Sequence, residues 1–333
     1  MQGGPWARPL LTIICFNTTH TLHGTVIKST GSWYLVRTDE GECVECKVKG
    51  NFRLRGIRST NPVAVGDKVT LLRAEGAGNA FITDIDERRN YIVRKASNLS
   101  KQSHILAANI DLALLVVTLA RPETTTTFID RVLATAEAYR VPAALVFNKV
   151  DDLNDDERAT LDYLEAVYTD CGYRCLRTSA LQGTGIDALR QLMQGQTSLL
   201  AGHSGVGKST LLNLLVPEAN ARTAHISNVH GTGMHTTTYS ECYDLPGGGS
   251  VIDIPGIKGF GTFNFEPAEV AHYFRDIFRL SADCRFNNCT HTHEPGCAVM
   301  QALADHQLAP TRYASYLSML DDKEEGKYRE KNM

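Results

Sequence analysis

The chain has 333 residues, a formal net charge of −3 at pH 7, and ordinary proportions of apolar (43%) and charged (21%) residues. Its length gives room for two domains and a small third unit, and no apolar run approaches the length of a membrane span, so we expect no transmembrane helix. The apolar stretch 10–16 is short and is followed by no A-x-A cleavage pattern, which argues against a signal peptide. Nine irregularly placed cysteines are typical of a reducing compartment with some thiols reserved for metal, and we therefore expect a cytoplasmic protein.

The charge is distributed unevenly along the chain. Residues 20–105 carry 14 Lys/Arg and 9 Asp/Glu, whereas residues 106–333 carry 19 basic and 28 acidic residues. A basic segment in an otherwise acidic chain indicates contact with a polyanion. An ordinary solvated surface explains the same counts equally well, so charge alone leaves both interpretations open.

Residues 1–20 are expected to form a loose extension, and residues 21–96 a β-rich first domain. Short runs of β-branched and aromatic residues alternate there with glycines, which is the pattern of strands joined by tight turns. The predicted strands are 24–28, 33–36, 42–48, 68–72 and 81–85. Five strands in about seventy residues favour a small closed β-barrel, with the OB-fold as the leading candidate.

One glycine-flanked stretch of this domain gathers basic side chains around an aromatic ring: Lys47, Lys49, Phe52, Arg53, Arg55 and Arg58. Nucleic-acid surfaces that track a backbone and stack a base use this combination. We interpret the stretch as an RNA contact, with a plain solvated loop as the alternative. Cys43 and Cys46 have C-x-x-C spacing, but no second pair lies nearby and the alternation indicates a strand, so zinc or redox chemistry there is the lesser interpretation.

After Ser97 the pattern changes to that of an α/β domain. Residues 110–119 and 143–147 are almost uninterrupted apolar runs, as expected for strands that are buried on both faces. Apolar residues at helical spacing lie between them, after the threonines 124–127. The second run ends in the motif Asn148-Lys149-Val150-Asp151. Because α/β sheets bind ligands at the carboxyl ends of their strands, the motif falls where a site is expected.

The N-K-x-D motif has the chemistry of a guanine pocket. The Asp151 carboxylate can accept hydrogen bonds from both N1–H and the exocyclic amino group of guanine, which adenine does not offer in that arrangement. Asn148 can hold the loop and reach the base, and the stem of Lys149 can lie along the ring plane. Further on, a backbone N–H of Ser179 or Ala180 can reach guanine O6. Buried acceptors left unpaired by the wrong base give discrimination of roughly 10⁴ or more.

The stretch G-H-S-G-V-G-K-S at 202–209 matches the phosphate-binding P-loop G-x-x-x-x-G-K-[ST]. A strand-like run, 197–201, precedes it and a helix opening follows it, so backbone N–H groups and the positive helix end would point at an anion. This context argues against a chance glycine turn before a lysine. Lys208 would reach the β- and γ-phosphates, and the Ser209 hydroxyl would bind Mg²⁺. The predicted nucleotide-binding residues here are Gly202, His203, Ser204, Gly205, Val206, Gly207, Lys208, Ser209 and Thr210.

The order of these motifs is unusual, because the guanine motifs precede the P-loop, whereas they follow it in Ras-like GTPases. With this order the chain resembles the circularly permuted TRAFAC GTPases, specifically the YjeQ/RsgA family of small-ribosomal-subunit-dependent GTPases, over about residues 22–320. The resemblance implies a multidomain fold. It comprises an N-terminal OB-fold β-barrel, a central circularly permuted α/β P-loop GTPase domain at 97–262, and a C-terminal α-helical zinc-binding domain at 263–333. The predicted helix 186–193 can lead directly into the P-loop strand, so the permutation keeps every sheet contact.

Two downstream stretches resemble the nucleotide switches of this family. The resemblance places the threonine that binds Mg²⁺ and the γ-phosphate at Thr237, with Thr236 and Thr238 left open. A D-x-x-G motif follows, in which Asp253 would hold Mg²⁺ through water and the Gly256 N–H would contact the γ-phosphate.

The residue after Gly256 is Ile257, at the position where Ras-like enzymes carry the glutamine that orients water. An isoleucine side chain forms no hydrogen bond, so slow intrinsic hydrolysis that a partner stimulates is expected. His235, in the predicted first switch, is our candidate for positioning the water, with a phosphate contact or a structural role as the alternatives. The predicted catalytic residues are therefore His235, Thr237 and Lys208.

The C-terminal part opens with an amphipathic stretch, 267–280. Its apolar stripe predicts core packing and consists of Val270, Tyr273, Phe274, Ile277 and Phe278. A last helix is predicted around 313–320, followed by a charged, mobile tail from Asp321.

Between these two helices lies a group of potential metal ligands: Cys284, Cys289, His291 and Cys297. Three thiolates and one imidazole suit a closed tetrahedral site for structural zinc, with no open position for catalysis. The set also matches the zinc knuckle of the family, with His293 as a competitor to His291.

The resemblance implies a GTP phosphohydrolase that binds GTP or GDP with Mg²⁺, carries one structural Zn²⁺, and acts as a monomer without a membrane. Its implied partners are the small (30S) ribosomal subunit and 16S-type rRNA, and its hydrolysis would be coupled to late maturation or checking of that subunit. The barrel and the zinc domain would contact the rRNA. Two alternatives stay open: a permuted GTPase that acts on a protein or membrane partner, and an RNA-binding assembly protein that uses nucleotide only as a structural ligand.

Overall fold

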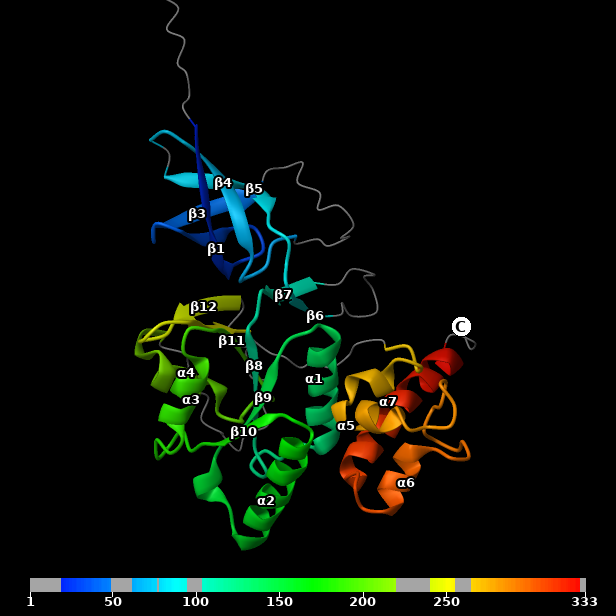
Figure 1. The fold of residues 1–333 in the computed structure, drawn as a ribbon. Helices are drawn as coiled ribbons and strands as arrows, with labels where there is room; N and C mark the ends of the chain where they lie inside the picture. Colours follow the sequence, from blue (N-terminus) through cyan, green and yellow to red (C-terminus); the bar gives the residue numbers. More distant parts are fainter. Residues whose placement is uncertain are drawn as a thin grey trace, which may run out of the picture.

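The computed structural model describes residues 19–48, 62–76, 78–94, 104–219, 240–254 and 265–329. They form three parts (Figure 1): a β-barrel, a central α/β domain below it, and a helical domain beside helix α1. This is the multidomain architecture that the sequence predicts. The predicted domain boundaries themselves stay predictions. Among the described residues, none of the helices combines the length and the apolar character needed to cross a bilayer.

The barrel closes on itself through five strands. Strand β1 pairs with β2 and β4, β2 pairs with β3, and β5 joins β3 to β4. Alternate residues point inward, and Val26, Val36, Leu71 and Ile82 are fully buried. The five predicted strands are confirmed. Their bounds are β1 (Thr19–Ser29), β2 (Tyr34–Thr38), β3 (Cys43–Val48), β4 (Lys68–Ala74) and β5 (Asn79–Ile85).

The central domain is a sheet in the order β10-β9-β8-β11-β13-β12, parallel except for β12. Every residue of β8 is buried, as the apolar run predicts, because helices cover both faces of the sheet. The strands are β8 (Leu112–Val117), β9 (Ala143–Phe147), β10 (Arg174–Arg177), β11 (Thr197–Ala201), β12 (Ser240–Asp244) and β13 (Ser250–Asp253). The helices are α1 (Thr126–Ala138), α2 (Asp155–Asp170), α3 (Ile186–Met193) and α4 (Lys208–Leu215), with 3₁₀ turns η1 (Val150–Asp152) and η2 (Pro217–Ala219).

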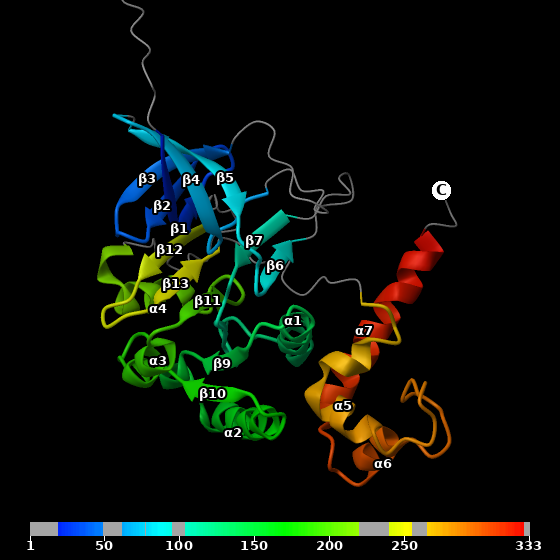
Figure 2. The same ribbon diagram turned by 45° about the horizontal axis from the view of Figure 1, so that its top comes forward.

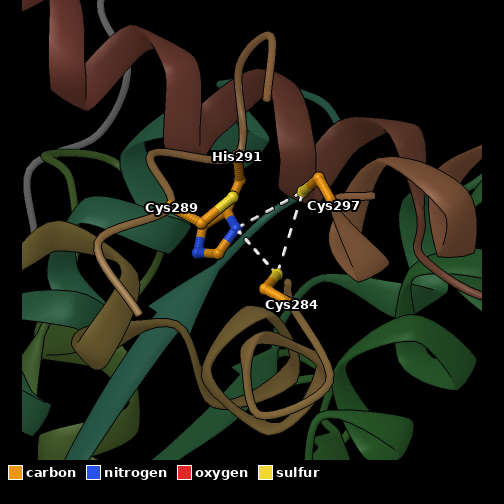
Figure 3. Close-up of side chains that lie close together, drawn as sticks. All are labelled: Cys284, Cys289, His291 and Cys297. Atoms are coloured by element: carbon orange, nitrogen blue, oxygen red, sulfur yellow. Dashed lines mark hydrogen bonds between the residues drawn. The ribbon is translucent and has the colours of Figure 1, made fainter. Parts of the chain in front are cut away.

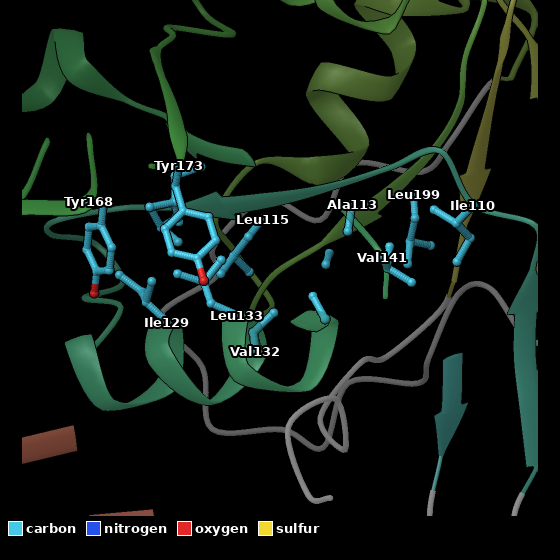
Figure 4. Close-up of a cluster of buried hydrophobic side chains, with 14 of the residues drawn as sticks. Ile110, Ala113, Leu115, Ile129, Val132, Leu133, Val141, Tyr168, Tyr173 and Leu199 are labelled. Atoms are coloured by element: carbon cyan, nitrogen blue, oxygen red, sulfur yellow. The ribbon is translucent and has the colours of Figure 1, made fainter. Parts of the chain in front are cut away.

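Each face of this sheet packs against its own pair of helices. Leu115 of β8 packs with Leu133 of α1 and Tyr168 of α2 on one face, which Figure 4 shows. Leu114 of β8 packs with Leu189 of α3, together with α4, on the other face. Successive side chains of β8 thus point to opposite faces of the sheet, toward α1 and α2 on one face and toward α3 and α4 on the other. The ends of the strands are connected by loops.

Two features connect the barrel to the central domain. A small sheet of β6 (Tyr91–Arg94) and β7 (His104–Ala108) lies between them in both views (Figures 1 and 2). In addition, β1 pairs with β12, so that barrel and central sheet form one continuous sheet of eleven described strands. Lys28 lies opposite Glu241 in this pairing and forms an ion pair with it at 2.9 Å.

The helical domain contains η3 (Val270–Tyr273), α5 (Arg275–Ser281), α6 (Ala298–Ala304) and α7 (Pro310–Arg329). The stretch 267–280 is thus not one continuous helix, because Phe274 has an extended backbone (φ −107°, ψ 100°) between η3 and α5. Because of this break, the side chains after Phe274 point in other directions than they would in one continuous helix. Ile277 is fully buried as predicted, whereas Phe278 is 53% exposed, so its assignment to the buried stripe is wrong.

The chain after Asp321 also differs from the prediction. The expected mobile tail begins as helix, because α7 continues to Arg329. Lys, Glu and Arg have high helix propensity, which explains how a charged segment extends a helix that begins by packing on the core.

Candidate nucleotide site and metal centre

The predicted P-loop connects β11 to α4 with the backbone that its glycines allow. Gly202, Gly205 and Gly207 have φ values of 141°, 86° and 98°, in the region that side chains disfavour. A Cβ atom on Gly202 would lie 2.3 Å from the carbonyl oxygen of Val116, and one on Gly207 would lie 2.3 Å from the Asn148 amide nitrogen. The glycines therefore let the loop pass close to both β8 and the guanine motif.

Lys208, the first residue of α4, folds back over the loop. Its Nζ donates to the carbonyl oxygens of Gly202 (2.8 Å) and His203 (2.6 Å). Burial lowers the pKa of Lys208, an effect that the Asp253 carboxylate opposes. Burial likewise raises the pKa of Asp253, opposed by Lys208. Asp253 ends β13 beside Leu200 of β11, so the two predicted phosphate-side residues both lie in a partly desolvated region at the strand ends.

Asn148 connects the three sequence motifs. Its side chain is 2% exposed, and its Nδ2 donates to the carbonyl of Val206 in the P-loop at 2.8 Å. Its Oδ1 accepts from the Thr178 hydroxyl (3.1 Å) and from the Ala180 N–H (3.2 Å). Leaving such buried groups unpaired costs about 1–3 kcal/mol each. Asn148 therefore acts here as a brace between loops that are far apart in the sequence.

The other members of the guanine motifs lie around this brace. Lys149 has a left-handed backbone (φ 63°) and its Nζ donates to the carbonyl of Arg121 at 2.6 Å. Within the described part of the chain, the half-buried Asp151 carboxylate has no hydrogen-bond or ion-pair partner. The N–H groups of Ser179 and Ala180 both have acceptors, the carbonyl of Thr184 and the Asn148 Oδ1.

The structure adds one segment that the sequence analysis missed, the loop between β8 and α1. Pro122 of this loop lies against the P-loop, since a Cβ on Gly205 would be 3.3 Å from its Cδ. Phe128, in the first turns of α1, stacks on His203 with ring centroids 3.6 Å apart. The available signal was position, because this loop also follows the carboxyl end of a buried parallel strand.

Several residues of the predicted switches and of the predicted RNA contact belong to the stretches 49–61, 220–239 and 255–264. The residues outside the described part of the chain are His235, Thr236, Thr237, Thr238, Gly256 and Ile257, together with Lys49, Phe52 and the basic stretch 53–58. Lys47 is described, and its Nζ lies 4.2 Å from the centre of the Trp33 ring. Cys43 is exposed and Cys46 is buried on β3, which fits the strand interpretation of that C-x-x-C pair.

The predicted zinc ligands come together in one cluster (Figure 3): Cys284, Cys289, His291 and Cys297. Their ligand atoms all lie within 4.8 Å of one another. The His291 Nδ1 is 3.6 Å from the Cys284 Sγ and 3.5 Å from the Cys297 Sγ. Zinc bonds of about 2.3 Å to sulfur and 2.0 Å to nitrogen in a tetrahedron place the ligand atoms roughly 3.5–3.8 Å apart. The donor set therefore fits a zinc ion.

The surrounding residues hold this cluster in shape. His293 lies outside it and contacts the Thr292 hydroxyl at 2.8 Å, so His291 is the histidine of the set. The hydroxyl of Tyr313, on α7, donates to the carbonyl of His291 at 2.7 Å. Although burial opposes the change, hydrogen bonds from the Thr290 hydroxyl and from the backbone N–H groups of Thr290, His293 and Glu294 itself lower the pKa of Glu294. Such outer contacts orient metal ligands.

Comparisons with known proteins agree with this geometry. The sequence model described as RsgA GTPase matches residues 85–263, and the model of the RsgA N-terminal domain matches residues 23–82. The small ribosomal subunit biogenesis GTPase RsgA of Bacteroides fragilis is 60% identical over 308 residues, which cover 92% of this chain and 99% of that protein. The protein of the same name from Porphyromonas gingivalis is 57% identical over 312 residues, covering 92% and 99%.

Solved structures show the same architecture. The crystal structure of YjeQ from Thermotoga maritima has a TM-score of 0.74 at 32% identity, over 91% of this chain and 98% of that one. YloQ, described as a circularly permuted GTPase, has a TM-score of 0.71 at 28% identity, over 92% and 96%.

Proposed function

The chain belongs to the RsgA GTPase family and hydrolyses GTP, and from this premise we propose that its GTP cycle serves small-ribosomal-subunit biogenesis, with Asp151 reading guanine and the P-loop holding the phosphates. The single observation that carries the site assignment is the Asn148 brace. It joins the guanine loop, the Ser179–Ala180 loop and the P-loop through one buried side chain, so three separate motifs act as one pocket.

On the base side, Asp151 accepts from guanine N1–H and the exocyclic amino group, for which its carboxylate is unpartnered among the described residues. Lys149 lines the ring plane, and its left-handed backbone turns the loop toward the pocket. Ser179 and Ala180 border guanine O6. Their N–H groups exchange or share their present acceptors when the base is bound.

On the phosphate side, the backbone of the P-loop residues 202–210 cradles the β- and γ-phosphates. Lys208 leaves the two carbonyls it now contacts and pairs with phosphate oxygens. Ser209 and Thr237 would hold Mg²⁺ directly and Asp253 through water, while Gly256 donates to the γ-phosphate. The ion supplies charge neutralisation of the transferring phosphoryl group.

Water attack requires an orienting group that Ile257 does not supply, and His235 is our candidate for that role. Because His235 belongs to the predicted first switch, we propose that a partner orders that switch before His235 can position the water, and the small ribosomal subunit is the partner we assign. The barrel and the helical domain contact 16S-type rRNA in this proposal. The protein acts as a monomer in the cytoplasm, and one zinc ion bound by the cluster of three cysteines and His291 holds the loop 284–297 together.

Steady-state GTP turnover by the purified chain tests this function. We expect slow hydrolysis alone, at least ten-fold stimulation by purified small subunits, and none by large subunits. A rate that is the same with and without small subunits contradicts the assigned partner. In the same assay His235→Ala is expected to abolish the stimulated rate while leaving GDP affinity intact, and unchanged stimulation would remove His235 from the mechanism.

A further inference from the structure

The loop between β8 and α1 is a rigid projection beside the guanine motif. The Thr124 N–H donates to the Thr118 carbonyl at 2.9 Å, and the Thr118 N–H donates to the Thr124 hydroxyl oxygen at 3.2 Å. The Thr118 hydroxyl also donates to the carbonyl of Pro122. Because these bonds close the loop at its base, its tip has a fixed position relative to the sheet.

Arg121 stands at that tip and contacts the guanine loop on both sides of Asp151. Its carbonyl accepts from Lys149 Nζ at 2.6 Å. Its guanidinium donates to the Asp152 carboxylate at 2.6 Å and also to the Asp152 carbonyl. The two residues that flank the Val150–Asp151 dipeptide are therefore both held by one arginine.

The same guanidinium reaches the start of α2. It donates to both oxygens of Glu157 at 3.1 Å each. Glu157 in turn accepts from the Asn154 N–H at 2.9 Å and forms the capping box of α2. Arg121 thus connects the rigid loop, the turn η1 and the helix that follows it.

The guanine loop is held mostly by contacts to other segments: Asn148 anchors its start, and the Val150 N–H donates to the Thr178 carbonyl at 3.2 Å, while Arg121 holds its end. The turn η1 has three residues, and Lys149, which precedes it, makes no side-chain cap hydrogen bond. A carboxylate that accepts two hydrogen bonds from one base edge must be held in one orientation, and selectivity falls when the geometry loosens.

We propose that Arg121 is a positioning residue for guanine selectivity, which fixes the loop from Lys149 to Asp152 so that the Asp151 carboxylate faces the base. This inference rests on the proposed role of Asp151. Arg121 itself does not touch the nucleotide. Its contribution is alignment, since exposed ion pairs add little to overall stability.

The test compares dissociation constants for GDP and inosine diphosphate, which lacks the exocyclic amino group that Asp151 reads. In Arg121→Ala the ratio of the two constants narrows by about five-fold, the change that corresponds to two exposed ion pairs. Arg121→Lys, which keeps one charge contact, falls between the wild type and Arg121→Ala. Alanine and arginine share the strain of the left-handed backbone (φ 51°), and the carbonyl contact to Lys149 survives both substitutions.

Arg190→Ala is the matched control. Arg190 has the same 49% exposed side chain and also pairs with a carboxylate and a carbonyl, Asp187 at 2.8 Å and Leu214 at 2.7 Å, but on α3 and α4. Arg190→Ala is expected to leave the ratio of the dissociation constants for GDP and inosine diphosphate unchanged. Asp152→Asn tests the same contact from the other side and narrows the ratio without altering Arg121. A wild-type ratio in Arg121→Ala, or equal narrowing in Arg190→Ala, overturns the proposal.

Asp151→Asn separates this proposal from the function beneath it. Its amide can donate to the carbonyl that xanthine carries at the same ring position, so the variant is expected to prefer xanthosine diphosphate over GDP. If Asp151→Asn still prefers GDP, the guanine assignment itself fails. If it prefers xanthosine diphosphate while Arg121→Ala keeps the wild-type ratio, only the role of Arg121 fails.

Discussion

The central domain has two junctions, and the charged contacts of the two are of opposite kinds, exposed in one and buried in the other. Toward the barrel, β1 pairs with β12 over two residue pairs, and the charged contacts lie at the surface. Lys28 and Glu241 are 38% and 29% exposed, and Arg37 and Asp244 are 32% and 63% exposed. Toward the helical domain, Arg312 of α7 is nearly inaccessible and binds two buried carboxylates, one on each domain.

The buried junction is a network centred on one guanidinium. Arg312 donates to Asp130 of α1 at 2.6 Å and to Asp276 of α5 at 2.7 and 2.9 Å. The Tyr168 hydroxyl also donates to Asp130, at 3.0 Å. Around these groups, Ala134 of α1 packs into the apolar core of the helical domain.

This difference determines how each junction responds to change. A hydrated ion pair can be lost or exchanged for water at little cost. The barrel junction therefore depends on strand pairing and on buried apolar residues such as Val65, which packs with Ala107 and Ile110. A buried charge has no such substitute, and loss of one partner leaves the others uncompensated. We therefore expect the helical domain to be held in one orientation on α1, and the three predictions below test that contrast.

Loss of the proposed zinc ion is expected to have the largest effect. Cys297→Ser removes a ligand of the proposed zinc ion, whose binding supplies on the order of 10 kcal/mol in structural sites. Tyr313 of α7 hydrogen-bonds to His291 in the loop 284–297, so loss of zinc is expected to increase hydrogen exchange throughout the helical domain. Hydrogen exchange at the barrel junction is expected to stay unchanged. Metal content and hydrogen exchange check this. Cys43→Ser, on the barrel surface, is the control, and full zinc retention in Cys297→Ser would rule out the assigned site.

Breaking the buried network comes next. Arg312→Ala leaves Asp130 and Asp276 buried without their counter-charge and is expected to cost about 3–5 kcal/mol of unfolding free energy. Urea unfolding of the two proteins measures it. A loss of unfolding free energy below about 1 kcal/mol would be no larger than that of a surface ion pair, and the two junctions would then not differ in this respect.

Breaking the exposed pairs has the smallest effect. Arg37→Ala removes the contact to Asp244 and is expected to cost about 0.2–1 kcal/mol, less at high salt because exposed charges are screened. The same unfolding measurement at low and high salt checks both points. A salt-independent loss comparable to that of Arg312→Ala would show that the two junctions do not differ.

The sequence predicted the features that local pattern encodes. The unbroken apolar run of β8 requires burial on both faces, the glycines of the P-loop require positive φ, and the donor types of the metal cluster define its chemistry. The contacts that it did not predict join residues that are far apart in the sequence. Asn148 was expected to hold its own loop, but its bonds to Val206 and Ala180 follow no spacing rule, and neither does the pairing of Arg312 with Asp130, because these partners meet only after folding.

The errors have a related cause. The prediction of a buried stripe from Val270 to Phe278 assumed an unbroken helix. The extended backbone of Phe274 interrupts that helix, and Phe278 is exposed to solvent. Arg121 showed no motif at all, and only its place at a strand end indicated a role. Apolar periodicity thus predicts the buried face of a helix only as far as the helix continues without a break.

The most direct test of the account is calorimetric titration of Mg²⁺–GDP into the wild type and Asn148→Ala. If the guanine loop and the P-loop form one pocket through this buried side chain, the wild type binds one GDP and Asn148→Ala binds it about 10–100-fold more weakly, since two or three buried hydrogen bonds are lost. Equal affinity in a folded Asn148→Ala would contradict the account.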